Sequence, residues 1–65
     1  MADEYGLSPR QRAFVEHYVV LNNATQAYIN AGYSPKNAGP NAGALIKRTN
    51  IQQAIEALRP KNVDI

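Results

Sequence analysis

The chain has 65 residues, a formal net charge of +2 and no cysteine, so it allows one domain without disulfides or a cysteine-based zinc site. A domain of this size buries only about 60% of the surface that its unfolded chain exposes, so its stability requires compact helix packing. A hydrophobic fraction of 45% is typical of a globular protein. No apolar run approaches the roughly 20 residues of a membrane span, and the acidic residues 1–5 do not resemble a secretory signal. We therefore expect a cytoplasmic protein that does not contact a membrane.

The charged residues are distributed unevenly along the chain. No carboxylate occurs between Glu16 and Glu56, whereas Lys36, Lys47 and Arg48 lie inside that interval. A surface that faces phosphates needs such a distribution, because a carboxylate would repel them. The alternative is a solvated face that lacks acids by chance.

The first predicted helix begins after Ser8 and runs to about Val20. Ser8 precedes Pro9, which suits the first helical position, and Gln11 completes a capping box. Its apolar stripe consists of Phe14, Tyr18 and Leu21, widened by Ala13, Val15 and Val19.

The second predicted helix begins at Asn23, with Gln26 three residues later, and ends at Gly32. One of its faces carries Ala24, Ala27, Tyr28 and Ala31. Alanines let two helix backbones approach closely. We expect Tyr33, in the turn that follows, to fold back and fix the angle to the next helix.

Ser34 and Pro35 repeat the opening of the first helix and predict a third helix with Ser34 as its cap. Its apolar stripe is Ala38, Ala42, Leu45 and Ile46. Gly39 and Pro40 interrupt this segment, because proline removes a helical hydrogen bond. We expect either a first turn over residues 35–38 and a restart at Pro40, or a kink.

The fourth predicted helix is capped by Asn50 and stopped by Pro60. The prediction is an all-α, compact bundle of four short helices, with a flexible N-terminus over 1–7, a domain over 8–59 and a tail or linker over 60–65. Tyr5 is expected to be mobile. The predicted core is Phe14, Tyr18, Tyr28, Tyr33, Leu45, Ile51, Ile55 and Leu58.

The second helix, the Gly32 turn and the third helix have the outline of a DNA-binding helix-turn-helix, in which the second of the two helices enters the major groove. Lys36, Asn37 and Asn41 are candidates for contacts with base edges, and Ser34 is a candidate phosphate ligand. The other candidate phosphate contacts are Arg10, Arg12, Lys47 and Arg48. For Arg10 and Arg12 the alternative is simple surface charge. For Lys47 and Arg48 it is a favourable interaction with the helix dipole.

Neither catalysis nor a metal site is indicated. His17 is the sole histidine, so it lacks the partners of a zinc site. Glu16 and Glu56 sit on polar helix faces with no sign of a pocket, and the glycines form no phosphate loop. We expect no enzyme activity and no cofactor. The tyrosines fall at core spacing, which favours packing over stacking on bases.

The segments LSPRQRAFVEHYVV, NATQAYINAGYS and IQQAIEAL, within residues 7–58, resemble the N-terminal domain of bacteriophage terminase small subunits. The resemblance covers about four fifths of the chain. Its most specific positions are Gln11, Phe14, Tyr18, Asn23, Ala24, Thr25, Ala27, Ala31, Gly32, Tyr33 and Ser34.

The resemblance implies recognition of double-stranded viral DNA in the infected bacterial cell and its delivery to the terminase large subunit, which holds the ATPase and nuclease. Family members form rings through a separate helical region. No such region follows Pro60 here, so we expect a chain that is monomeric by itself and binds DNA in the micromolar range or more weakly, depending on salt. Pro40 interrupts a helix that the family usually keeps continuous. Two alternatives are a small transcriptional regulator or transposase-type DNA binder, and a protein-interaction module.

Overall fold

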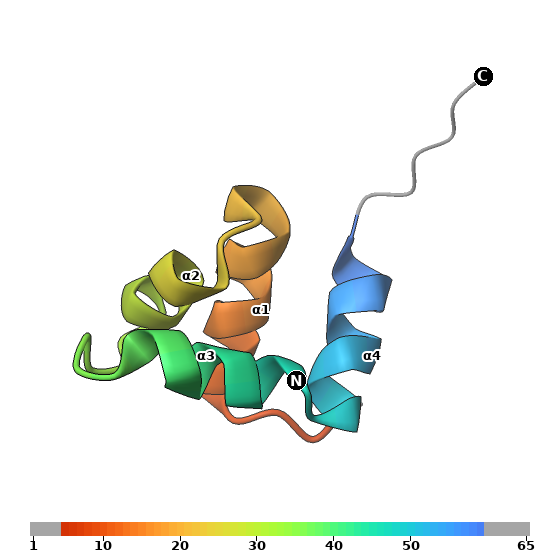
Figure 1. The fold of residues 1–65 in the computed structure, drawn as a ribbon. Helices are drawn as coiled ribbons and strands as arrows, with labels where there is room; N and C mark the ends of the chain where they lie inside the picture. The colour runs from red at the N-terminus through yellow and green to blue at the C-terminus, as the bar shows by residue number, and fades with distance from the viewer. Residues whose placement is uncertain (1–4, 60–65) are drawn as a thin grey trace.

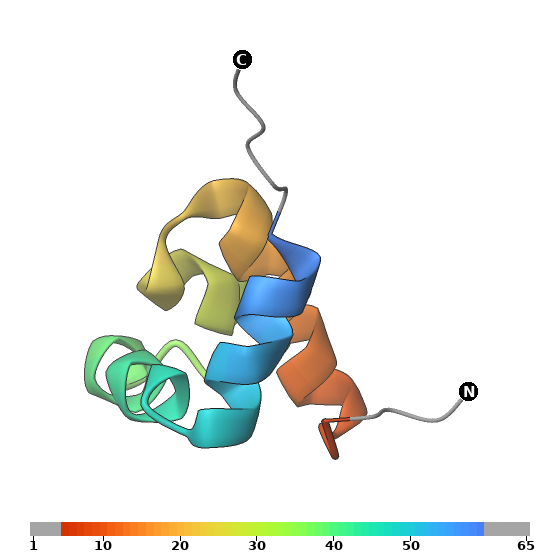
Figure 2. The same cartoon turned by 90° about the vertical axis from the view of Figure 1, so that its right-hand side faces the viewer.

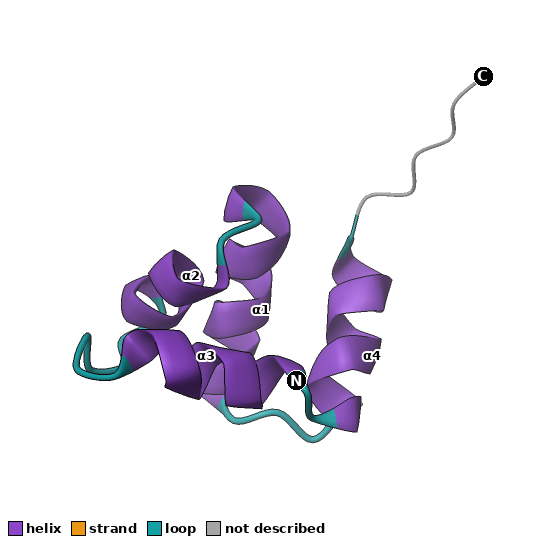
Figure 3. Ribbon diagram, in the orientation of Figure 1, coloured by secondary structure: helices purple, strands orange, loops and turns teal. Residues whose placement is uncertain are grey.

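The computed structural model describes residues 5–59, which form four α-helices and no strand (Figures 1 and 3). The helices are α1 (Pro9–Leu21), α2 (Ala24–Asn30), α3 (Ala38–Ile46) and α4 (Thr49–Leu58). The predicted all-α class is therefore confirmed. The predicted C-terminal tail and the first four residues of the predicted flexible N-terminus lie outside the described residues.

α1 packs against α4, and both helices run upward in the views of Figures 1 and 2. α3 lies at the level of their lower halves and contacts α4. α2 packs against both α1 and α3, which joins α3 to the first helix. None of the described helices combines the length and the hydropathy that a bilayer crossing requires.

The core consists of a few large side chains surrounded by alanines. Phe14, Val15 and Ile51 are fully buried, and the alanines of α2, α3 and α4 allow the helix backbones to approach closely. Of the eight predicted core residues, Phe14, Ile51 and Ile55 are buried, and Tyr18, Tyr28, Tyr33 and Leu45 pack partly buried against them. The prediction is wrong for Leu58, which is 39% exposed. Leu58 lies on the apolar stripe of α4 but is its last residue, and helical spacing does not reveal how far the neighbouring helices extend.

Two of the predicted helix starts are confirmed in atomic detail. At α1, the backbone N–H of Gln11 donates to the Ser8 hydroxyl (3.1 Å), and the Ser8 N–H donates to the Gln11 side chain (2.9 Å). At α2, the Gln26 N–H donates to Asn23 Oδ1 (3.0 Å). Gly32 follows α2 with φ +104°, the positive angle expected of a glycine just past a helix.

The predicted cap of the last helix is wrong. α4 begins at Thr49, and the residue before it, Arg48, makes no side-chain cap. Asn50 lies inside the helix, and its Nδ2 donates to the Tyr5 carbonyl (3.2 Å). Tyr5 and Leu7 also pack against the core. The structure therefore attaches Tyr5 to the bundle, in place of the mobility predicted for it, because a partner 45 residues away is not visible in local sequence.

The third helix begins later than predicted. The Ser34 hydroxyl accepts from the Lys36 N–H (3.1 Å) and so closes a local turn without capping a helix. The Ala38 N–H donates to the Pro35 carbonyl (3.2 Å), which forms the predicted turn over residues 35–38. Asn37 then takes a left-handed conformation (φ +59°) that asparagine tolerates, and α3 starts directly after it.

Pro40 is accommodated without a restart because it is the third residue of α3. The first N–H groups of a helix have no acceptor inside it, so the missing N–H of proline removes no bond there. The first bond of this helix runs from the Asn41 N–H to the Asn37 carbonyl (3.1 Å). Lys36 and Asn37, which were predicted to lie on the helix, therefore precede it.

Candidate nucleic-acid interface

The exposed side of α3 carries two rows of residues. Asn41 and Ala44 lie three residues apart on the helix, and Arg48, which follows the helix in an extended conformation, borders the same groove; these three residues are called the first row. Pro40, Gly43 and Lys47 form the second row, at spacings of three and four residues. Ala38 and Ala42, on the opposite side of the helix, are buried. The helix thus presents small and polar groups outward and packs through its alanines.

The first row borders a shallow open groove between α1 and α3, called here the α1–α3 groove, with a volume of about 330 Å³. Amide side chains, one guanidinium and two phenol rings supply its polar groups, so the groove offers hydrogen-bond donors and acceptors and one positive charge. No carboxylate lines it. Its lining residues are Gln11, Tyr28, Tyr33, Asn41, Ala44, Leu45 and Arg48.

A second cavity adjoins the N-terminus of α1 and is called here the α1 pocket. It is lined by Ser8, Pro9, Arg10 and Tyr33 and has a volume of about 390 Å³. Tyr33 borders both this pocket and the α1–α3 groove. The two hollows therefore share one aromatic residue, and each is lined by an arginine.

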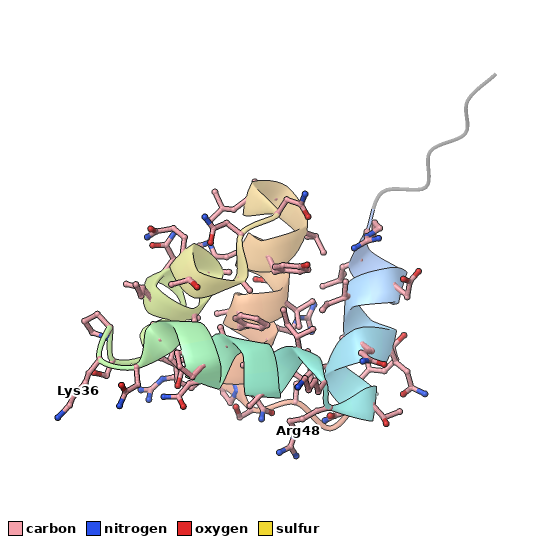
Figure 4. The ribbon with its side chains drawn as sticks, in the orientation of Figure 1. Lys36 and Arg48 are labelled. Carbon is pink, nitrogen blue, oxygen red and sulfur yellow. The ribbon has the colours of Figure 1, made fainter. Side chains whose placement is uncertain are left out.

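All eight residues predicted to contact DNA are exposed: Arg10, Arg12, Ser34, Lys36, Asn37, Asn41, Lys47 and Arg48. Lys36 precedes α3 and Arg48 follows it, and Figure 4 shows both side chains projecting from the same side of the molecule. The structure gathers Arg10, Asn41 and Arg48 around Tyr33. Lys47 lies in the other exposed row of α3.

The described carboxylates lie outside both hollows. Glu16 Oε2 pairs with Arg12 Nε (3.1 Å) one turn along α1, so Arg12 already has an anionic partner. Glu56 borders a separate cavity of about 280 Å³ together with Tyr18, Ile46, Gln52, Ile55 and Arg59. Within residues 5–59, the surface formed by the α1–α3 groove and the α1 pocket carries positive charge without an acid.

The aromatic residues form a connected column from the core to this surface. Phe14 stacks on Tyr18 (ring centroids 6.0 Å apart) and meets Tyr28 edge to face (6.4 Å). Tyr28 stacks on Tyr33 with centroids 4.2 Å apart and planes 5° apart. The preference for packed tyrosines is thus supported, and Tyr33 fixes the turn between α2 and α3. Gln11 and Tyr33 were predicted only as a cap and a core residue, although both also border the groove.

Burial raises the pKa of the Tyr33 phenol, and the neighbouring Tyr28 raises it further. Arg10 and a hydrogen bond with the Ser8 side chain lower that pKa but do not reverse the shift. The phenol therefore stays protonated at neutral pH. It faces the surface as a neutral group and adds no negative charge.

Within the part of the chain that the structure describes, no group of three or more His, Cys, Asp or Glu side chains comes together. His17 is half-buried on α1. The polar groups of the α1–α3 groove and the α1 pocket are suited to binding an anionic or polar surface.

The sequence matches the terminase small subunit family over residues 7–63. It is similar to the PBSX phage terminase small subunit of Bacillus subtilis (strain 168), with 38% identity over 58 residues. That alignment covers 89% of this chain and 22% of the relative, so the chain spans less than a quarter of the relative's length. No solved structure matches.

Proposed function

The chain belongs to the terminase small subunit family, and we propose that it is a non-catalytic DNA-binding domain that recognises viral DNA to initiate genome packaging by the large subunit. This role is exercised in the cytoplasm of the infected bacterial cell. The bound DNA is double-stranded, and cleavage and translocation are left to the partner ATPase. The α2–turn–α3 unit serves as the helix-turn-helix.

The observation that carries this proposal is the acid-free surface around α3. Lys36 and Arg48 project from the same side of the molecule, and Arg10 lies next to the groove that Arg48 lines. Each of these side chains is exposed. Neutralising phosphates releases the counterions condensed on DNA, which is the main source of affinity for a surface of this kind.

In the proposed complex, α3 faces the DNA with its two exposed rows. Lys36, Lys47 and Arg48 bind phosphates around it and fix the register of the domain, whereas Asn41 offers a donor and an acceptor to a base edge. Asn37 holds the left-handed turn that starts α3, so its part in recognition includes placing the helix. Gly43 and Ala44 add almost no bulk on this side, which allows the helix backbone to come close to the DNA.

A single copy of this domain makes few phosphate contacts. We therefore expect an affinity in the micromolar range or weaker, which falls as the salt concentration rises. The longer relative contains sequence outside the aligned part, and we propose that rings and large-subunit binding depend on such additional regions. Several domains held together in one assembly gain affinity through their high effective concentration.

The test is a salt titration of binding to duplex DNA by the natural chain and by Lys36→Ala, Arg48→Ala and Asn41→Ala. Loss of a phosphate contact reduces the slope of log K against log salt concentration by about one unit, so Lys36→Ala and Arg48→Ala should each do so. Asn41→Ala should keep the slope and relax sequence preference. Arg59→Ala is the matched control, because Arg59 is exposed but borders the separate cavity with Glu56.

Unchanged binding in all three variants would refute the assignment of this surface. Binding that persists at high salt and ignores Lys36 and Arg48 would favour the protein-interaction alternative. Dimers bound to a palindromic site would favour a transcriptional regulator.

A further inference from the structure

We propose that Tyr33 is a positioning residue that holds the Arg10 guanidinium ready to bind a DNA phosphate, a role that rests on the DNA binding proposed above. Arg10 would then contact the duplex from the α1 pocket while Arg48 contacts it from the α1–α3 groove. The first helix of the domain thereby gains a direct part in recognition.

The two N-terminal arginines of α1 differ in their partners. Arg12 Nε is paired with Glu16, whereas Arg10 has no carboxylate within ion-pair distance among residues 5–59. The Arg10 guanidinium lies over the Tyr33 ring, with its central carbon 5.6 Å from the ring centroid. A cation held on an aromatic face keeps its N–H donors available at the ring's edge, so Arg10 remains able to bind an anion.

The Tyr33 ring is itself held firmly. It stacks on Tyr28 at 4.2 Å, and Tyr28 meets the fully buried Phe14 edge to face. The Arg10 side chain also lies along the turn at Gly32, where an added Cβ would be 3.7 Å from Arg10 Nε. Arg10 is thus placed by a rigid column that begins in the core and by the backbone of the α2–α3 turn.

This placement has an energetic consequence for DNA binding. A free arginine loses much of its side-chain freedom when it binds a phosphate, which weakens the net contact. Part of that loss has already occurred when the guanidinium rests on Tyr33 before DNA arrives. Because Tyr33 lies in the turn that leads to α3, the same ring also fixes Arg10 relative to Asn41 and Arg48.

The experiment is a double-mutant cycle in DNA binding with Arg10→Ala and Tyr33→Leu, and with Arg12→Ala as the matched control. Arg10→Ala should weaken binding about fivefold in 0.1 M salt and reduce the salt slope by about one unit. Tyr33→Leu should weaken it about threefold, and the double variant should be no weaker than Arg10→Ala because both changes remove the same contact. Tyr33→Phe keeps the ring and should bind as the natural chain does. Arg12→Ala should alter the slope little.

Two results would overturn this role while leaving DNA binding intact. One is an unchanged slope in Arg10→Ala while Arg48→Ala lowers it. The other is full additivity of Arg10→Ala and Tyr33→Leu, which would indicate a purely structural Tyr33. If the natural chain binds no duplex even at low salt, the proposed function itself fails, and the role of Arg10 fails with it.

A second measurement on the natural chain covers the case in which Tyr33→Leu does not fold. The Nε–H groups of Arg10 and Arg48 are compared by NMR relaxation in the absence of DNA. Arg10 should have the higher order parameter, and the ring current of Tyr33 should displace the chemical shifts of the Arg10 side-chain protons. Equal mobility of the two side chains, without such a shift, would contradict the positioning role.

Discussion

Replacing Gly43 by alanine should stabilise the protein, because the structure has room for the added Cβ. Gly43 lies within α3, and a Cβ added there would meet no atom within 4 Å. The substitution therefore has no steric cost and gains the helix propensity of alanine, which is about 0.5–1 kcal/mol relative to glycine. In a domain of this size, 1 kcal/mol corresponds to roughly 4–8 °C in Tm. We expect Tm to rise by about 2–8 °C.

Gly39→Ala is the matched control within the same helix. A Cβ at Gly39 would lie 3.8 Å from Thr25 Oγ1, which is an ordinary contact, so space alone allows it. Gly39, however, precedes Pro40, and a residue with a Cβ disfavours helical geometry at that position. We expect no rise in Tm, or a fall. The assay is thermal unfolding followed by circular dichroism. A fall in Tm for Gly43→Ala, or an equal rise for both variants, would refute this account of α3.

Three further predictions concern the fold and are tested by the same unfolding assay. Ser8→Ala removes the cap of α1 and should cost about 1 kcal/mol, whereas an unchanged Tm would show that the capping box contributes nothing. Ile51→Ala deletes a fully buried side chain and should lower the free energy of unfolding by about 2–5 kcal/mol. Leu58→Ala, at a residue that is 39% exposed, should lower it far less. Equal losses of stability in the two variants would contradict the observed burial. The pKa of the Tyr33 phenol is raised on folding, so the unfolded chain loses that proton at lower pH than the folded chain does. The free energy of unfolding should therefore fall as the pH rises above about 10, and Tyr33→Phe should flatten this fall. An identical pH dependence in Tyr33→Phe would argue against the raised pKa.

Local sequence signals predicted the helices well where the partner groups are close in the chain. The capping box of Ser8 and Gln11 and the cap at Asn23 connect residues three positions apart, so their spacing is sufficient. The apolar stripes of α3 and α4 were predicted by the same periodicity. Tertiary contacts were not. Asn50 has the residue type of a cap, but its side chain bonds to Tyr5, and this competing partner is distant in sequence.

Local turn chemistry explains the error at the start of α3. Ser34 before Pro35 is typical of a helix cap, yet the Ser34 hydroxyl accepts from the nearest suitable N–H, that of Lys36. The helix start is then set by Asn37, one of the few residue types that tolerate a positive φ.

The candidate site was predictable in its charge but not in its shape. The interval without carboxylates was visible in the sequence, and the structure places its positive side chains on an exposed surface. The contact of Arg10 with Tyr33 was not visible, because it joins the first turn of α1 to a turn that follows α2. Gln11 was predicted as part of a helix cap and Tyr33 as a core residue. Neither pattern indicates that these residues also border the α1–α3 groove.

The most direct test of the central claim is to place one carboxylate in the α1–α3 groove by Ala44→Glu and to measure binding to duplex DNA in 0.1 M salt. Ala44 is exposed and lines the groove, and Ala44→Gln adds similar bulk without the charge. Ala57→Glu adds the same charge at an exposed position near the far end of α4. Ala44→Glu should weaken binding about tenfold more than Ala44→Gln does, through repulsion of nearby phosphates, and Ala57→Glu should have little effect. Equal binding by Ala44→Glu and Ala44→Gln would contradict the claim that this surface faces DNA.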